Sequence, residues 1–380
     1  MNYEKGLSIY TDEEARAAVQ ELFGYESLLR GMQAHLPPAL CAYILRAKDE
    51  VHSVLDFQTK IAHPLFKAVE QASIIRLTTS GFEHLDPSRQ YLFISNHRDI
   101  ILDSAYLNIV LFEHAFPTSQ IAIGDNLMRH RISELIFHIN KSFVVRRSGT
   151  PMELYRYSLQ LSDYIRRQIG EKRDSVWIAQ REGRAKDGDD RTQTGLLKML
   201  SLSAADSLKA HFRQLNLVPV AISYEYDPCD LLKAQEFLNK RADPAYKKTF
   251  EEDVQHMLLG LKGPKGHVHF HFGDPIDAEL EAFDHLPGTK KQLEALASWI
   301  DHSIHRHYRL WPVNYVAHDL LTDSHDCAAH YSPEERTTLE AFFQTRCDCL
   351  RHDAEGLGRD YLLRMYANPV LNQMTAQTKG

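Results

Sequence analysis

The chain has 380 residues, of which 43% are hydrophobic and 25% are charged. This is the composition of an ordinary globular protein and not of a disordered or fibrous chain. No uncharged apolar run approaches the roughly 18 residues of a membrane span. The N-terminus has no apolar stretch of the kind found in signal peptides, so we expect no signal peptide. The five cysteines form no even framework, which predicts free thiols and a cytoplasmic location.

The net charge of −7 is unevenly distributed along the chain. Residues 129–173 contain ten Lys and Arg and four Asp and Glu, which gives this segment a local charge of +6. A basic segment on an acidic protein favours a phosphate-bearing substrate or an anionic membrane surface over nucleic acid. On charge alone, a solvated helix face is an equally good interpretation. We therefore expect a soluble or peripheral protein that binds no nucleic acid.

Helical signals dominate the first 72 residues. Thr11 and Glu14 form a capping box that opens a helix reaching about residue 23. Pro37 and Pro38 interrupt the pattern, a longer helix is predicted over residues 39–57, and His63-Pro64 starts another short one. We expect a helical N-terminal region over residues 1–72.

Strand and helix patterns alternate from residue 73 onward. Strands are predicted at 73–78, 91–95, 120–123, 142–146, 175–180, 217–224 and 267–272. Helices are predicted at 100–114, 127–138, 151–169, 194–214 and 231–260. This alternation predicts an α/β domain over residues 73–280, with a mixed, mostly parallel sheet flanked by helices. Three further helices, at 292–308, 333–352 and 357–368, form an expected helical C-terminal region over residues 281–380.

The stretch over residues 91–103 carries the clearest chemical signal. A short apolar strand ends at Ser95-Asn96, His97 follows at once, and a helix begins near Ile100 with Asp99 as its N-cap. An imidazole at the carboxyl end of a strand lies where α/β sheets bind ligands. His97 can take a proton from a hydroxyl, and Asp103 can orient the ring. A structural histidine beside a capping aspartate is the alternative for this motif alone.

Three more stretches follow the ends of predicted strands. The first is Gly124-Asp125-Asn126, and the next is the pair Arg146-Arg147. The third is the glycine-containing loop with the sequence REGRAKDG, at residues 181–188. A last strand, at 217–224, carries Pro219 near its entrance. Guanidinium and ammonium groups at strand ends suit a phosphate ligand.

Taken in this order, the stretches NHRDIILD, GDNL with the following Arg pair, REGRAKDG and VPVAISY resemble the four motif blocks of the glycerolipid acyltransferases. This family contains the glycerol-3-phosphate and lysophosphatidic acid acyltransferases. The resemblance covers roughly residues 73–280, and four ordered blocks are more specific than any one of them. It implies transfer of an acyl group from acyl-CoA or acyl carrier protein to a hydroxyl of glycerol 3-phosphate or of a lysophospholipid such as 1-acylglycerol 3-phosphate, in phospholipid biosynthesis.

The resemblance also implies roles for individual residues. His97 would be the general base and Asp103 its orienting partner. The expected substrate-binding residues are Gly124, Asp125, Asn126, Arg147, Glu182, Gly183, Arg184, Lys186 and Pro219. No cofactor is expected beyond the acyl donor, and the protein is expected to lie on the inner face of the cytoplasmic membrane.

The chain departs from the family pattern at two points. Five residues separate His97 from Asp103, where the family has four, and Glu182 falls one position late when Arg184 is matched. An inactive acyltransferase-like protein that binds lipids is therefore the alternative to an enzyme. The identity of the acceptor, of the donor and of the oligomer stays open.

Other classes of site fit the sequence less well. The triplet at 97–99 mimics a kinase catalytic loop, but Ser104 stands where a kinase needs Asn, and no GxSxG serine-hydrolase motif occurs. The histidines and cysteines between residues 325 and 352 match no paired Cys-X-X-Cys spacing, so we expect no metal site there.

Overall fold

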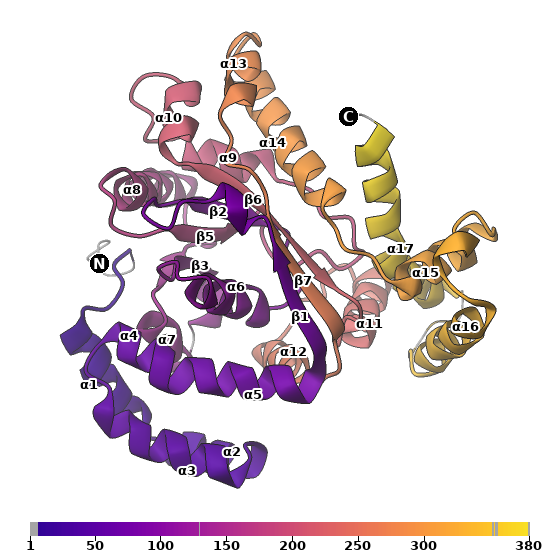
Figure 1. Cartoon of the computed structure of the whole chain (residues 1–380), viewed down its shortest axis with the longest axis horizontal. Helices are drawn as coiled ribbons and strands as arrows, with labels where there is room; N and C mark the ends of the chain where they lie inside the picture. The colour runs from indigo at the N-terminus through magenta and orange to yellow at the C-terminus, as the bar shows by residue number, and fades with distance from the viewer. Residues whose placement is uncertain (1–6, 129, 352, 354–355, 379–380) are drawn as a thin grey trace.

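The structure is a computed structural model that describes residues 7–128, 130–351, 353 and 356–378. A seven-stranded sheet lies at its centre, with helices on both faces (Figure 1). The strands are β1 (Ile74–Ser80), β2 (Leu92–Ser95), β3 (Gln120–Gly124), β4 (Ser142–Val145), β5 (Val176–Ala179), β6 (Leu217–Tyr224) and β7 (Gly266–Phe272). All seven predicted strands are confirmed, each to within two residues.

The strand order is β1-β7-β6-β2-β5-β3-β4. Neighbouring strands are parallel except β6 and β7, which are antiparallel. The expected α/β class, with a mixed and mostly parallel sheet flanked by helices, is therefore confirmed. Because β2, β5, β3 and β4 all run in the same direction, their carboxyl ends meet at one edge of the sheet.

The central strands are buried on both faces, as is usual for parallel sheets. In β2, Leu92 and Ile94 pack into one apolar cluster and Phe93 packs into another, and each is at most 1% exposed. The first cluster lies under α8 (Pro151–Gly170), α9 (Thr194–Leu200), α10 (Leu208–Gln214) and α14 (Thr289–Arg306). The second is covered by α5 (His63–Ser73), α6 (Leu102–Glu113) and α12 (Phe250–Lys262).

The N-terminal helices are α1 (Asp12–Leu22), α2 (Glu26–His35), α3 (Pro38–Ala47), α4 (Val54–Phe57) and α5. The predicted capping box at Thr11 and Glu14 is present. The prediction of a single helix over residues 39–57 is wrong, because α3 ends at Ala47 and Ser53 caps a separate helix, α4. These helices share a core with α7 (Arg131–Ile139), through Leu135 and Ile139.

Two other long predicted helices are each divided in two. The pattern at 194–214 becomes two helices, α9 and α10. Ser207 caps α10, because its side chain accepts from Ala210 N. The pattern at 231–260 becomes α11 (Asp230–Ala242) and α12, because Pro244 lies between them and Thr249 opens α12 with a capping box. Local caps and a proline therefore override the continuous helical period in both segments.

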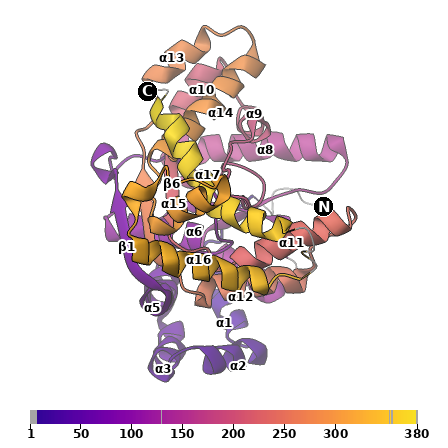
Figure 2. The same cartoon turned by 90° about the vertical axis from the view of Figure 1, so that its right-hand side faces the viewer.

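The C-terminal part of the chain contains α13 (Ala278–Asp284), α14, α15 (Pro312–Thr322), α16 (Pro333–Asp348) and α17 (Leu357–Thr378). The last three form an apolar cluster of their own, beside α11 and α14 (Figure 2). The predicted domain boundary at 280/281 falls inside α13. The division of the chain into three regions, at 72/73 and 280/281, remains a proposal.

Two further expectations concern cysteines and membranes. All five cysteines are free thiols in the structure. Among the residues that the structure describes, no helix is both long enough and apolar enough to cross a bilayer.

Candidate active site

His97 lies at the carboxyl end of β2, where the side chain of Asn96 fixes the end of the strand. Asn96 Nδ2 donates to the carbonyl of Ile222 at 2.9 Å, and Ile222 N donates to Asn96 Oδ1 at 2.8 Å. These two bonds join β2 to β6 just beyond the last paired residue, Ser95. The imidazole that follows is therefore attached to a rigid part of the sheet.

The imidazole is held by a buried carboxylate. His97 Nδ1 lies 2.8 Å from Asp103 Oδ2, and Asp103 is fully buried. The same carboxylate accepts from Arg98 N at 2.6 Å, from Asp99 N at 3.0 Å and from Tyr224 Oη at 3.1 Å. With Nδ1 bound to Asp103, the other ring nitrogen, Nε2, is the one that can exchange a proton with a substrate.

Asp99 bonds the turn that precedes the regular helix, but the N-cap residue of that helix is Ile101 and not Asp99 as predicted. Its Oδ1 accepts from Ile101 N at 2.9 Å and from Leu102 N at 2.8 Å. The regular helix begins at Leu102, two residues later than expected. Burial, reinforced by the charge of Asp103, raises the pKa of Asp99. The contacts expected of Asp99 and Asp103 are both present, while their catalytic roles stay predictions.

The second and third motif blocks contact each other at the same edge of the sheet. Arg147 N lies 3.3 Å from Asp125 Oδ2, and Arg147 Nε lies 3.6 Å from Glu182 Oε1. The guanidinium of Arg147 packs directly over Gly124, where an added Cβ would come within 2.7 Å of Arg147 Cζ. Gly124 is therefore needed for the close approach of the arginine.

Arg184 lies below the surface, on the side of α12. It is 8% exposed, and its Nη2 is 3.0 Å from His256 Nδ1. Burial, together with the charge of Arg184, lowers the pKa of His256 to about 2, so this ring is neutral and its Nδ1 accepts the bond. Lys186 forms an ion pair with Glu236 of α11.

Several donors on the two loops that follow β2 and β5 are buried without a partner among the described residues. They are Arg98 Nε, Gln180 Nε2, Arg181 Nε and Arg184 Nη1. Buried polar groups are normally hydrogen-bonded, so a group of orphaned donors requires an explanation.

Asn126, Gly183 and Pro219 complete the set of predicted site residues. Asn126 lies beside Arg147 over Gly124, where an added Cβ would come within 2.7 Å of Asn126 Oδ1. Gly183 has φ +68°, a left-handed conformation that favours glycine, and a Cβ there would meet no atom within 4 Å. Pro219 is buried inside the sheet, opposite Ile94, and its carbonyl accepts from Gly273 N at 2.9 Å. Pro219 therefore lies within the strand, one position before the last residue pair of β2 and β6, Ser95 and Val220.

The loop that carries His97 is supported from behind by a second buried ionic network. Lys233 of α11 is fully buried, pairs with Asp227 and donates to the carbonyl of Arg98 at 3.0 Å. Asp190 lies 3.5 Å from Arg98 Nη1 and accepts from Tyr308 Oη at 3.0 Å. These contacts connect the start of the candidate site to residues that follow α14.

Helix α17 holds the loop of the third motif block. Asn368 Nδ2 donates to the carbonyl of Asp187 at 2.8 Å, and Asn372 Nδ2 lies 3.1 Å from Asp189 Oδ1. Gly188, with φ +75°, passes so close to α17 that an added Cβ would come within 2.3 Å of the carbonyl oxygen of Met365. The C-terminal helices thus fix the conformation of the loop that contains Arg184.

Four residues of the site were not singled out from the sequence. Tyr224 ends the VPVAISY strand, so its position was visible, although its bond to Asp103 was not. Trp177 meets the His97 ring edge-on, with a centroid distance of 5.8 Å. Lys233 and His256 carry no local motif that could have revealed their contacts, because their partners lie 135 and 72 residues away along the chain.

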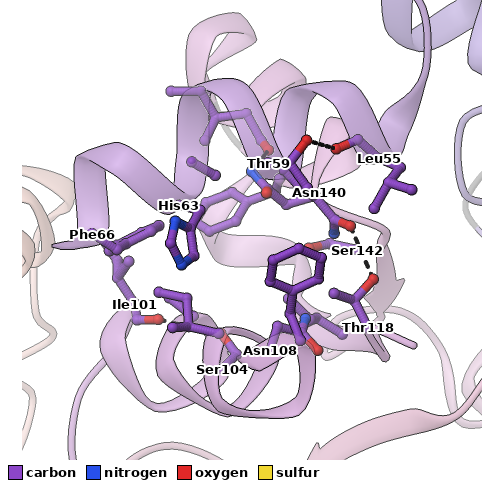
Figure 3. A pocket seen from close by; sticks show the side chains of 18 residues that line it. Leu55, Thr59, His63, Phe66, Ile101, Ser104, Asn108, Thr118, Asn140 and Ser142 are labelled. Carbon is purple, nitrogen blue, oxygen red and sulfur yellow. Dashed lines mark hydrogen bonds between the residues drawn. The ribbon is translucent and has the colours of Figure 1, made fainter. Parts of the chain in front are cut away.

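An apolar cavity of about 90 Å³ lies beside the helix that carries Asp103 (Figure 3). It is lined by α4, α5 and the π-helical segment between them (Gln58–Ala62) on one side, and by α6, β3 and α7 on the other. Ile101 and Ser104 line the cavity, so it extends to the first turn of α6. Leu55 and Phe112, which are 56% and 42% exposed, also line it, so the cavity reaches the surface.

No protein-family model matches the chain. Among solved structures, the chain is similar to a 1-acyl-sn-glycerophosphate acyltransferase, PlsC, from Thermotoga maritima, with 12% sequence identity and a TM-score of 0.35. The match covers 77% of this chain and 92% of that one. At this TM-score the similarity supports no inference about this chain, so its function must be argued from the site.

Proposed function

We propose that the protein is an O-acyltransferase of glycerophospholipid synthesis, which moves a fatty acyl group from an acyl thioester to the hydroxyl of glycerol 3-phosphate or a lysophospholipid. The observation that carries the proposal is the His97–Asp103 pair at the sheet edge, with a 2.8 Å contact and a fully buried carboxylate. His97 Nε2 would take the hydroxyl proton as the oxygen attacks the thioester carbonyl. The proton would then pass to the departing thiolate.

The proposal is tested by offering the purified chain both acceptors with both donors, acyl-CoA and acyl carrier protein, and resolving labelled lipid products. We expect an acyl ester on the acceptor and one free thiol released for each ester formed. If thiol is released without ester, the chain is a thioesterase instead. If no pair reacts while labelled lipid still binds, the inactive lipid-binding alternative is favoured.

Arg184 is proposed to hold the acceptor phosphate, because its buried Nη1 lacks a partner among the described residues. We expect Arg184→Ala to raise the acceptor KM much more than the donor KM. Loss of a charge-assisted bond of about 1.5–3 kcal/mol corresponds to roughly ten- to hundredfold. Arg147→Ala, at the exposed side of the same edge, should have a smaller effect, because Arg147 already faces Glu182.

Steady-state kinetics with each substrate varied in turn would measure this difference. Thermal unfolding serves as the control, since Arg184 also bonds His256. Equal changes in both KM values, together with a lower unfolding temperature, would show that Arg184 is structural.

The apolar cavity beside α6 is proposed to receive part of the acyl chain. Ala105 lines it, and Ala105→Leu would fill part of its volume. We expect turnover of long-chain donors to fall about tenfold or more relative to short-chain donors, since one methylene in an apolar pocket discriminates by about that factor. Ala210→Leu, at an exposed position of α10, is the matched control. A chain-length profile left unchanged by Ala105→Leu would place the acyl chain elsewhere.

An anionic membrane surface is the proposed source of the lipid substrate. On α8, Met152, Tyr155 and Leu159 are 59%, 55% and 40% exposed at the spacing of one helix face, and Arg156 is exposed beside them. Several other cations of the basic segment at 129–173 are paired, for example Lys141 with Asp174. Arg129 lies outside the described residues. The exposed face of α8 therefore carries the apolar part of the proposed contact.

We expect the chain to float with anionic vesicles at low salt and less at high salt, because salt screens the attraction of the cations to the lipid. The double variant Met152→Ser, Leu159→Ser should bind more weakly. Leu371→Ser with Met374→Ser, two exposed apolar residues of α17, is the matched control. Equal loss in both double variants would argue against a specific α8 contact.

A further inference from the structure

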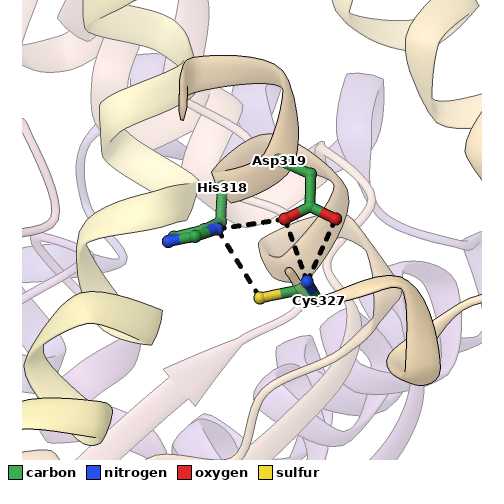
Figure 4. Close-up of side chains that lie close together, drawn as sticks. All are labelled: His318, Asp319 and Cys327. Carbon is green, nitrogen blue, oxygen red and sulfur yellow. Dashed lines mark hydrogen bonds and ion pairs between the residues drawn. The ribbon is translucent and has the colours of Figure 1, made fainter. Parts of the chain in front are cut away.

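His318, Asp319 and Cys327 form a compact cluster in the C-terminal helices, outside the candidate active site (Figure 4). His318 and Asp319 lie in the last turn of α15, and Cys327 lies in the loop that folds back after it. One ligand atom from each side chain lies within 4.8 Å of the other two. All three residues are buried, at 5%, 0% and 0% exposed.

Two distances within the cluster are close to the edges of a tetrahedral zinc site. His318 Nδ1 lies 3.5 Å from Cys327 Sγ and 3.1 Å from Asp319 Oδ1. Zinc bond lengths of about 2.0–2.1 Å to nitrogen, 2.3 Å to sulfur and 2.0–2.2 Å to oxygen give tetrahedral edges of about 3.6 Å for N···S and about 3.3–3.4 Å for N···O. The nitrogen is thus close to the distance that one ion requires from each of the other two atoms, and the sulfur and the oxygen lie within 4.8 Å of each other.

The imidazole makes two contacts within the cluster, through the same ring nitrogen. A protonated Nδ1 can donate to Asp319 Oδ1 and point at Cys327 Sγ, which is a weak acceptor at 3.5 Å. A cation at the common point would instead bind the deprotonated nitrogen together with the oxygen and the sulfur.

The surroundings of Asp319 supply the support that metal ligands usually have. Tyr331 Oη donates to Asp319 Oδ2, and Arg336 Nη1 donates to Tyr331 Oη at 2.9 Å. Cys327 N lies 3.2 Å from the same Oδ2. Oδ1 also accepts from Cys327 N at 3.1 Å and from Ser324 Oγ at 3.3 Å. These bonds fix the orientation of the carboxylate, with Oδ1 on the side of His318 Nδ1, as hydrogen bonds to metal ligands usually do.

The ligand types indicate which ion the cluster would prefer. One nitrogen, one oxygen and one sulfur suit zinc, whereas magnesium and calcium prefer oxygen ligands alone. The sequence of residues 325–352 showed no metal-binding motif, because two of the three proposed ligands, His318 and Asp319, precede this stretch and lie on α15. His352, another residue of that stretch, lies outside the described residues.

We propose that His318 Nδ1, Asp319 Oδ1 and Cys327 Sγ bind one zinc ion, which clips the loop after α15 to the end of that helix. Cys327 binds as the thiolate and releases its proton to solvent. Because α15 packs against α17, which holds the loop at 187–189, the ion stabilises the helices behind the candidate active site. Its role is structural and does not depend on the proposed reaction.

Metal content and cobalt spectroscopy test the site without any activity assay. We expect the full chain, purified without chelator, to retain about one zinc per molecule, and cobalt to give a thiolate-to-metal charge-transfer band. Cys327→Ser and His318→Gln should each weaken zinc binding by at least about a hundredfold, since loss of a supporting group alone costs up to that much. Cys349→Ser, at the exposed cysteine, is the matched control and should bind like wild type.

Thermal unfolding of the wild-type chain keeps the test decisive if a variant does not fold. We expect a chelator to lower the unfolding temperature and zinc, but not magnesium, to restore it. The proposal is overturned if wild type gives no cobalt–thiolate band, or if Cys327→Ser retains zinc as wild type does. It is equally overturned if the chelator leaves the unfolding temperature unchanged.

Discussion

Replacing His97 with Ala is expected to abolish acyl transfer while the fold persists. Loss of a general base costs about a hundred- to ten-thousandfold in turnover. The structural cost should be small, because Asp103 keeps its bonds from Arg98 N, Asp99 N and Tyr224 Oη when the imidazole is gone. A single lost bond of this kind contributes about 1 kcal/mol to the free energy of unfolding.

The measurement pairs product formation with thermal unfolding for His97→Ala, and for His285→Ala as a control at an exposed histidine. The control should leave both quantities near wild type. Retention of wild-type turnover by His97→Ala would show that another group takes the hydroxyl proton. A large fall in unfolding temperature would show that the imidazole is chiefly structural.

The strands were predictable from the sequence because each is a short apolar run between turn signals. Leu92, Phe93 and Ile94 are buried on both faces of the sheet, so the run is continuous, as parallel strands require. The helix breaks at residues 201–207 and 243–249 were harder to predict, since helical periodicity continues through them. Ser207 and Thr249 were visible as possible caps, but nothing in the local pattern decided between a cap and a helix interior.

The candidate site was predictable where its residues are neighbours in sequence. His97, Asp99 and Asp103 lie within seven positions, and the geometry of a strand-to-helix turn limits which of them can meet. Arg184 is different, because its partner, His256, lies 72 residues away on α12. The same holds for Lys233, whose contact with the carbonyl of Arg98 depends on how α11 packs. Such contacts follow from tertiary packing and leave no local signal.

The second large effect is expected at Asp103. Asp103→Asn should lower turnover by about 10³–10⁴-fold, because a neutral amide cannot hold the imidazole in the tautomer that leaves Nε2 free to accept a proton. The carboxylate receives four donors, including His97 Nδ1, whereas an amide has a single acceptor oxygen. We therefore also expect a loss of about 1–3 kcal/mol in the free energy of unfolding.

Asp99 provides the matched comparison, because it is buried beside Asp103 and its Oδ1 accepts from the backbone N–H groups of Ile101 and Leu102. Asp99→Asn keeps an acceptor oxygen and should leave turnover within a few-fold of wild type, since Asn caps helices about as well as Asp. Asp99→Ala should lower stability by about 1 kcal/mol, again with little effect on turnover at a temperature where the chain stays folded. Turnover and unfolding measured on all three variants would separate the two aspartates. If Asp99→Asn abolished turnover and Asp103→Asn did not, the orienting carboxylate would be Asp99, and the five-residue spacing would mark a different arrangement of the pair.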